Sequence, residues 1–258
     1  MKAVVLAAGR GRRLHPYSRE IPKALLPVAD VPLIDFVISG LSRGGIRDVL
    51  VVTGYRGSIL ENFLLGRAYV DVSVECVRNT EYQRGNGASL SCAWRLLRGE
   101  PFLLHMVDHL VDPQLIIRLC SPSGGTSASV DLSPRFEPQL NDATRVLLDY
   151  DGNILRFGKR LDKFSGVDAG VFRCDPYVLE SAHELSLKKY HLTVSQVMNN
   201  AIDAGHSVRG IDVTSLLWLD IDTRRDLLFA ERLLGELQQT AFQELGWDRL
   251  KAPQPPSV

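Results

Sequence analysis

The sequence predicts an α/β fold: a single domain with a mixed, mostly parallel central sheet flanked by helices. The first indication is residues 3–8, an uninterrupted apolar run of the kind found in strands that are buried on both faces. The second is the order strand, helix, strand, helix, strand that follows, which predicts right-handed parallel crossovers. At 258 residues, the chain is long enough to bury the core of one large domain.

The first half of the chain supplies most of the predicted parallel sheet. Apolar residues recur at helical spacing over residues 31–41, and Gly44 and Gly45 stop that pattern. The predicted strands are residues 3–8, 49–53, 70–77 and 102–107, and the predicted helices are residues 31–41, 59–65 and 88–97. Between the third strand and the third helix lies a polar, turn-forming segment, residues 79–87.

The second half has shorter apolar runs and more turn signals. Asp151-Gly152 between two such runs predicts a β-hairpin. The predicted strands are residues 127–132, 143–149, 153–157, 167–173, 208–213 and 216–221, the last two closing the sheet, and the predicted helices are residues 176–185, 192–204 and 223–245. Residues 133–142 form a loop and a candidate lid. We expect one domain over residues 1–246 and a flexible proline-rich tail over residues 247–258.

Composition excludes several classes of partner. Thirty basic and thirty acidic side chains cancel, so no overall field favours nucleic acid or an anionic membrane. No stretch approaches the roughly 20 apolar residues that span a bilayer, and no secretory signal precedes the first strand. The four cysteines are too far apart in sequence for a CxxC zinc pair: Cys76, Cys92, Cys120 and Cys174. We expect a cytoplasmic protein in which they are buried as small hydrophobic residues.

The stretch Met1–Asp30 has the composition of a polyphosphate-binding loop. Gly9 and Gly11 follow the first strand, where glycine lets backbone N–H groups approach phosphate oxygens, and arginines and Lys23 add positive charge. Leu14 stands where a dinucleotide-binding fingerprint requires glycine, and a Walker A Gly-Lys-Ser/Thr is absent. A tight turn beside a solvated basic face is the competing interpretation.

Two carboxylates and a lysine form the other part of the predicted site. Asp108 follows the strand at 102–107, and Asp220 follows a later apolar run; at a common sheet edge they could hold Mg²⁺ against a triphosphate. The alternatives are a turn or N-cap role for Asp108 and a helix-capping role for Asp222. Lys159, after the hairpin, could meet an acceptor's phosphate, although by itself it has the features of a surface lysine.

Taken together, these motifs resemble the nucleotidyltransferases that make nucleotide sugars and related activated alcohols. The resemblance rests on LAAGRGRRL and PKALLPV near the start, and it extends from Met1 to about Leu234. Within that superfamily, the sequence looks most like the CTP:inositol-1-phosphate cytidylyltransferase branch, through RGNGASL at 84–90, VDH at 107–109, GK at 158–159, VDAGVF at 167–172 and WLDIDT at 218–223. Arg12 departs from the family's usual threonine, and Val107 from the branch's frequent serine.

The resemblance implies a Rossmann-like, GT-A-like nucleotidyltransferase fold and Mg²⁺-dependent transfer from CTP to inositol 1-phosphate. It implies that Arg13 and Lys23 contact the nucleotide phosphates as catalytic groups and that Asp108 and Asp220 hold Mg²⁺. Residues expected at the nucleotide are Leu6, Ala7, Ala8, Gly9, Gly11, Asn86 and Gly87; residues expected at the acceptor are Lys159, His109 and Asp168.

Other functions remain open from the sequence. One is transfer to a sugar 1-phosphate, phosphocholine or a phosphonate, with another nucleobase. Another is a non-catalytic nucleotide-binding regulatory subunit, which the presence of Arg13, Lys23, Asp108 and Asp220 together disfavours. Many enzymes of this branch are fused to a membrane-embedded phosphatidyltransferase-type domain, so the resemblance also implies a functional link to such an enzyme. The oligomeric state, including a homo-oligomer, is open.

Two tryptophans and one histidine are expected to be structural. Trp94 and Trp218 lie in apolar elements and are predicted to belong to the core, whereas Trp247 near the tail could pack at a partner surface. His105 is predicted to be a satisfied structural histidine.

Overall fold

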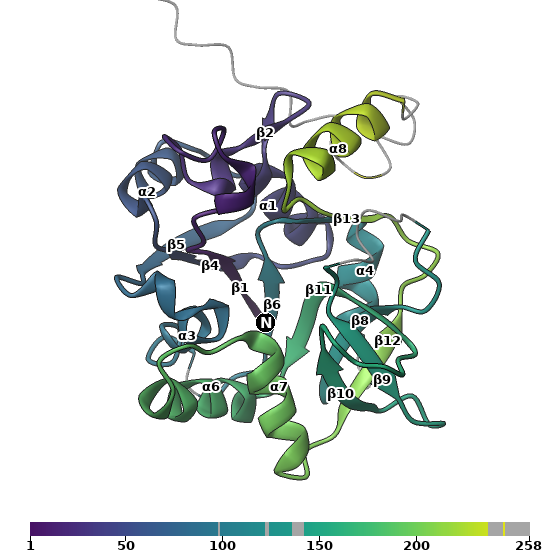
Figure 1. Ribbon diagram of the computed structural model, residues 1–258. Coiled ribbons are helices and arrows are strands. Elements are labelled where there is room, and N and C mark those ends of the chain that lie inside the picture. The colour runs from purple at the N-terminus through teal and green to yellow at the C-terminus, as the bar shows by residue number, and fades with distance from the viewer. Residues whose placement is uncertain (98, 122–123, 136–141, 237–244, 246–258) are drawn as a thin grey trace, which may run out of the picture.

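A computed structural model describes residues 1–97, 99–121, 124–135, 142–236 and 245. Its centre is a nine-stranded mixed sheet with helices on both faces (Figure 1), which confirms the predicted fold class. The main path of the sheet runs in the order β10-β9-β11-β6-β1-β4-β5; off this path, β8 pairs with β11 and β12 pairs with β8. The predicted lid, residues 133–142, lies mostly outside the described residues, as do the tail at 247–258 and Trp247.

The N-terminal part of the sheet is parallel, as predicted. Its strands are β1 (Lys2–Ala7), β4 (Asp48–Thr53), β5 (Ser73–Arg78) and β6 (Phe102–Met106). β1 pairs with both β4 and β6, and β4 pairs with β5, all in parallel. The carboxyl ends of these strands therefore meet at one edge, where ligands usually bind in α/β sheets.

The C-terminal part of the sheet is built on a long antiparallel strand, β11 (Gly166–Cys174), which pairs with β6, β8 (Thr126–Asp131) and β9 (Arg145–Leu148). β9 and β10 (Ile154–Gly158) form the hairpin that Asp151-Gly152 predicted, and Gly152 has a positive φ of 82° there. β12 (Val208–Asp212) adds to β8 in parallel.

Alternate residues of β1 enter two different cores. Val4 and Leu6 pack towards α3 (Asn86–Ser91), α6 (Pro176–Lys188) and α7 (Val194–Asp203). Ala3 and Val5 pack towards α1 (Leu33–Arg43), α2 (Gly57–Leu65) and α4 (Pro113–Leu119). Burial on both sides is what an uninterrupted apolar strand requires. A third cluster lies under α8 (Arg224–Glu236).

Several predicted elements differ from the structure. Residues 216–221 do not close the main sheet: their strand, β13 (Trp218–Asp220), pairs with β7 (His109–Val111) in a separate two-stranded ribbon. A small hairpin of β2 (Pro27–Val28) and β3 (Val31–Pro32) precedes α1, which begins only at Leu33. Pro32 has extended backbone and takes the N-cap position, so the helix starts two residues later than predicted.

Two further expectations about individual side chains need correction. Cys174 is buried as predicted, but Cys92 and Cys120 are only partly buried, and Cys76 is exposed because β5 is the last strand at its side of the sheet. Trp218 is buried, whereas Trp94 is only partly buried and stacks on His183 with ring centroids 5.1 Å apart. Among the described residues, no helix has both the length and the apolar character needed to cross a membrane.

Candidate active site

The glycine-containing loop after β1 brings Lys23 to the carboxyl edge of the parallel strands. Gly11 has a left-handed backbone with φ +61°, and a Cβ added there would lie 3.2 Å from the Lys23 Cβ. Glycine is needed on both counts, because other residues rarely adopt this φ and the lysine stem fills the space. Gly11 thus supports Lys23 directly.

The Lys23 ammonium is buried between two carboxylates. Its side chain is 6% exposed, Nζ lies 2.5 Å from Asp108 Oδ2, and Nζ also pairs with Asp222 Oδ1. Burial alone would lower the pKa of Lys23, but Asp108 and Asp222 together raise it above its ordinary value. Burial would likewise raise the pKa of Asp108, but the neighbouring Lys23 holds it well below its usual range. Both groups are therefore charged at neutral pH.

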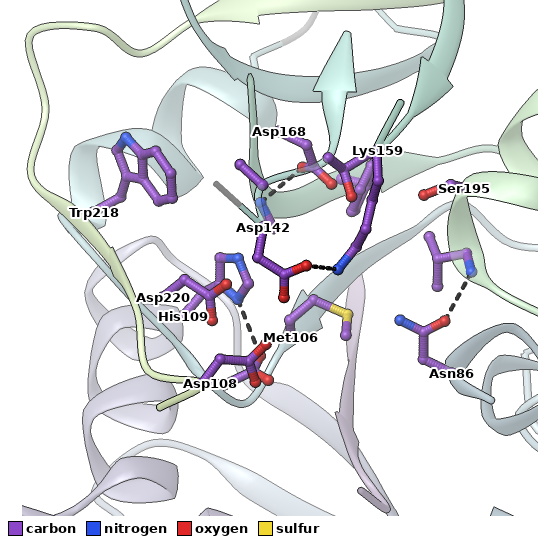
Figure 2. Close-up of a pocket in the computed structure, with 16 residues that line it drawn as sticks. Asn86, Met106, Asp108, His109, Asp142, Lys159, Asp168, Ser195, Trp218 and Asp220 are labelled. Atoms are coloured by element: carbon purple, nitrogen blue, oxygen red, sulfur yellow. Dashed lines mark hydrogen bonds and ion pairs between the residues drawn. The ribbon is translucent and has the colours of Figure 1, made fainter. Parts of the chain in front are cut away.

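The β7–β13 ribbon brings the two predicted metal-binding carboxylates together. Asp108 lies in the turn between β6 and β7, and Asp220 ends β13 directly opposite His109 in the ribbon's register. Donor atoms of Asp108, His109 and Asp220 lie within 4.8 Å of one another, and Figure 2 shows the three side chains converging on one side of the cleft.

The chemistry of this cluster fits a hard divalent cation. Asp220 Oδ1 is buried and has no hydrogen-bond partner among the described residues. Burial, together with Asp108 and Asp222, raises the pKa of Asp220 to about 7, as expected for a carboxylate short of positive charge. Carboxylate oxygens are the ligands that Mg²⁺ prefers, so Asp108 and Asp220 suit such an ion.

His109 holds the Asp108 carboxylate in position through a hydrogen bond. Its Nδ1–H donates to Asp108 Oδ1 at 3.0 Å, and its ring stacks on Trp218 with centroids 6.3 Å apart. Although burial lowers it, the pKa of His109 is raised to about 9 by Asp220 and Asp108, and a protonated imidazole is a poor metal ligand. A Cβ at Gly170 would lie 2.2 Å from the His109 ring, so this glycine makes room for the imidazole.

Asp222 faces the cations, not the helix cap that the sequence indicated. Besides Lys23, it pairs with the Arg13 guanidinium. The start of α8 is capped by Thr223 and Asp226: Thr223 Oγ1 accepts from the Asp226 N–H at 3.3 Å, and Asp226 Oδ2 accepts from the backbone N–H groups of Thr223 at 2.7 Å and Asp222 at 3.2 Å. Because Thr223 and Asp226 cap the helix, the side chain of Asp222 is available to the site.

Arg13 and Lys159 reach the site from opposite sides and meet at Asp142. Lys159 Nζ lies 2.8 Å from Asp142 Oδ1, and Asp142 Oδ2 accepts from Arg13. These side chains are much more exposed than Lys23, at 50% for Arg13 and 57% for Lys159. Sequence reasoning missed Asp142, since one aspartate in a polar loop carries no local signal of a role.

A cleft with two chambers runs through these residues. The larger chamber, about 590 Å³, extends from the glycine loop to α7, and the smaller, about 150 Å³, lies beside β11. Residues that line both are Asn86, Met106, Asp108, Thr144, Lys159, Ser195 and Asp222. The chambers are therefore contiguous at Asp108 and Lys159, where two substrates could meet.

Four of the predicted nucleotide residues line the larger chamber: Leu6, Ala8, Gly9 and Asn86. The other three contact protein. Ala7 is buried in the core on the other face of β1, Gly11 packs on Lys23, and a Cβ at Gly87 would lie 2.6 Å from the Thr193 carbonyl oxygen. Sequence reasoning missed the α7 side chains in this chamber, among them Ser195, Gln196 and Asn199. The capping pattern Thr193 to Gln196 marks the start of α7 but does not indicate its position.

Asp168 and His109, two of the residues predicted at the acceptor, line the smaller chamber. Burial raises the pKa of Asp168 to about 6, although its Oδ1 accepts a hydrogen bond of 2.8 Å from the Gly170 N–H. His105, in contrast, is buried in the sheet, where Nδ1 donates to the Met106 carbonyl at 2.8 Å and Nε2 has no partner among the described residues. His105 is therefore structural, but only one of its two ring nitrogens has a hydrogen-bond partner among the described residues.

The sheet, the glycine loop with its cations and the adjacent carboxylates define a domain of the nucleotidyltransferase class. A family model described as the MobA-like NTP transferase domain matches residues 3–140, just over half of the 258 residues. The chain belongs to this family.

Two similar proteins align with almost the whole chain. This chain is 35% identical over 233 residues to a bifunctional IPC transferase and DIPP synthase of Rubrobacter xylanophilus. The alignment covers 90% of this chain and 51% of the relative. The protein of the same description from Aquifex aeolicus is 30% identical over 246 residues, or 95% of this chain and 53% of the relative. The chain thus spans about half the length of these relatives.

Solved structures share the fold. The inositol-1-phosphate CTP transferase from T. maritima superposes with a TM-score of 0.79 at 24% identity, covering 96% of each chain. A UDP-glucose pyrophosphorylase complexed with UDP-glucose superposes with a TM-score of 0.76 at 17% identity, covering 91% of this chain and 98% of the other. At these identities the likeness establishes the fold alone.

Proposed function

We propose that this domain transfers a cytidylyl group from CTP to inositol 1-phosphate, with Mg²⁺ as cofactor. The observation that carries the proposal is the junction of the two chambers, where Arg13, Lys23 and the paired carboxylates Asp108 and Asp220 lie between a nucleotide-sized space and a smaller polar one. The descriptions of the relatives and of the T. maritima structure support CTP and an inositol phosphate as the substrates.

The larger chamber suits the nucleotide. Its walls include the backbone of the glycine loop, and Arg13 and Lys23 line it. Asn86 Oδ1 accepts from the Val194 N–H at 2.9 Å, which leaves its amide nitrogen on the cavity side as a donor (Figure 2). A nucleoside here would place its phosphates against the two cations.

The smaller chamber suits a phosphorylated polyol. Lys159 offers an ammonium to the phosphate, and Asp168 is a buried carboxylate that can accept hydrogen bonds from hydroxyl groups. Trp218 and Phe172 supply apolar wall. The chamber's small volume of about 150 Å³ favours a compact acceptor.

The proposed chemistry is an in-line displacement without a covalent enzyme intermediate. An oxygen of the acceptor phosphate attacks the α-phosphorus of CTP; the bond from that phosphorus to the bridging oxygen breaks, and pyrophosphate leaves with the electron pair. Lys23 and Arg13 would hold the phosphates in position and offset the charge that develops at the α-phosphorus. Bound at Asp108 and Asp220, Mg²⁺ would supply additional positive charge.

A sugar 1-phosphate is the second candidate acceptor. Proteins described as mannose-1-phosphate guanylyltransferases, such as one from Arabidopsis thaliana, are 26% identical over 241 residues. A hexose phosphate and an inositol phosphate present similar rings of hydroxyl groups to Asp168. The same assay separates the two candidates.

The test is pyrophosphate release in a matrix of nucleotides and acceptors with Mg²⁺. ATP, GTP, CTP, UTP and dTTP are each combined with inositol 1-phosphate, glucose 1-phosphate, phosphocholine and a phosphonate. Release with CTP and inositol 1-phosphate alone is the expected result. Release with another pair would identify that nucleotide and acceptor as the substrates in place of CTP and inositol 1-phosphate. No release with any pair would favour a non-catalytic nucleotide-binding subunit.

The cellular setting is part of the same proposal. A CDP-activated inositol phosphate is a donor for an enzyme that attaches inositol phosphate to another alcohol, and the bifunctional descriptions of the relatives support a link to a second transferase. We propose a cytoplasmic location because CTP is available there. Fractionation of cells followed by detection of the chain tests this location.

A further inference from the structure

Lys23 already occupies the side of the carboxylate cluster where a metal ion would be held. Its ammonium is 6% exposed and contacts Asp108 Oδ2 at 2.5 Å and Asp222 Oδ1. A packed stem holds it there, because the space beside Gly11 is filled by the lysine's Cβ, Cγ and Cδ atoms. In the free protein, Lys23 is thus an internal cation of the site.

Lys23, the raised-pKa imidazole of His109 and the Arg13 guanidinium face the cluster, yet within the described ranges they leave one carboxylate oxygen without a hydrogen-bond donor. Three carboxylates, those of Asp108, Asp220 and Asp222, lie around Lys23, and Asp220 Oδ1 is buried with no hydrogen-bond partner among the described residues. An oxygen left without a donor in a buried site costs free energy that a cation would recover. The cluster therefore retains an unpaired acceptor, Asp220 Oδ1, that a metal ion could use.

We infer that Lys23 competes with the divalent cation for Asp108, so that the free protein binds the metal weakly and the ammonium must leave Asp108 when the metal binds. A unit charge and a divalent ion a few ångströms apart repel each other strongly in a partly buried site. Asp222 lies beside both Lys23 and Arg13, so the ammonium has a second carboxylate to which it can remain paired.

The exchange couples metal binding to nucleotide binding. Lys23 also lines the larger chamber, where an ammonium released from Asp108 can pair with phosphate oxygens. By linkage, a triphosphate that draws Lys23 away from Asp108 strengthens metal binding, and the metal strengthens triphosphate binding to the same extent. This inference rests on the proposed function, through the divalent-cation site, but its test requires no nucleotide.

The test measures Mn²⁺ affinity of the full chain by isothermal titration calorimetry without nucleotide. Lys23→Gln removes the charge but keeps a hydrogen-bond donor for Asp108, and its dissociation constant for Mn²⁺ is expected to fall about tenfold or more. Lys23→Arg is the matched control: it keeps the charge, and its affinity should remain within a few-fold of wild type. Unchanged or weaker binding in Lys23→Gln would overturn the inference.

Two further variants test whether the effect is local. Arg10 is a cation of the same loop that lies over the Tyr55 ring, 5.3 Å from its centroid, and Arg10→Gln should leave the Mn²⁺ affinity unchanged. If Arg10→Gln increased the Mn²⁺ affinity as much as Lys23→Gln does, the effect would come from the overall loss of positive charge, and direct competition would be contradicted. Asp220→Asn should abolish the tight binding in the Lys23→Gln background, and its persistence would also overturn the inference.

Thermal unfolding provides an independent measurement if Lys23→Gln folds poorly. Without metal, this variant lacks one of the cations that face the carboxylates, so its Tm in EDTA should fall, and saturating Mn²⁺ should raise its Tm by more than it raises that of wild type. An equal rise in both proteins would contradict the competition. If Lys23→Gln binds Mn²⁺ more tightly as expected but no substrate pair releases pyrophosphate, the competition stands and only the proposed function is rejected.

Discussion

The site holds two kinds of ammonium–carboxylate pair that differ in their surroundings. Lys23 is paired with Asp108 in a buried setting, where its side chain is 6% exposed, whereas Lys159 is paired with Asp142 at 57% exposure. Exposed pairs contribute little, because water and salt screen them, while a charge fixed away from water acts at full strength on a developing charge. The buried Lys23–Asp108 pair should therefore contribute more to the chemistry, and the exposed Lys159–Asp142 pair should contribute to the selection of the acceptor.

Replacing the buried ammonium should have the largest effect. Lys23→Ala is expected to lower kcat on the order of 10²-fold or more, because Lys23 would act on the transition state. Steady-state pyrophosphate release with CTP and inositol 1-phosphate measures it. Lys163, an exposed lysine outside the cleft, supplies the control Lys163→Ala, and wild-type turnover in Lys23→Ala would refute the assigned role.

A buried imidazole beside this network should make stability depend on pH. Burial lowers the pKa of His105 to about 4, so below about pH 6.5 the unfolded chain binds a proton that the folded chain does not. Unfolding free energy should therefore fall as pH drops from 6.5 to 4, by on the order of 3 kcal/mol more than in His105→Gln. Urea denaturation at several pH values measures the difference; parallel profiles for both proteins would refute it.

Removing the exposed ammonium should change binding more than turnover. Lys159→Ala is expected to raise the KM for the acceptor about tenfold and to leave kcat within a few-fold, since the lost interaction is made equally in ground and transition states. Initial rates over a range of inositol 1-phosphate concentrations separate the two constants. A loss confined to kcat would place Lys159 with the buried Lys23–Asp108 pair.

An exposed ion pair outside the cleft should have the smallest effect of those compared. Arg156 and Asp203 join β10 to the end of α7 with an N–O distance of 3.0 Å and side chains 45% and 61% exposed. Asp203→Asn should change the unfolding free energy by less than about 1 kcal/mol and should leave turnover unchanged. A larger loss in urea denaturation would show that exposure is a poor guide to the strength of these pairs.

Much of the fold was predictable because its signals are local. Strand β1 is marked by its apolar run, the hairpin by Asp151-Gly152, and the parallel crossovers by the order of elements. The ribbon of β7 and β13 was not predictable, because these short strands pair across more than a hundred residues. Residues 216–221 have the apolar character of any strand, and nothing in that character indicates which sheet they join.

The residues of the site were likewise partly predictable from the sequence and partly not. The sequence by itself determined the glycine loop, the cations Arg13 and Lys23, and the carboxylates Asp108 and Asp220 at the ends of apolar runs. Tertiary structure decided which of these groups meet: it paired Lys23 with Asp222, placed Asp142 between Arg13 and Lys159, and brought α7 into the cleft. Periodicity and glycine conformation act between neighbours in the chain, whereas Coulomb contacts depend on distances in space that only the packed fold determines.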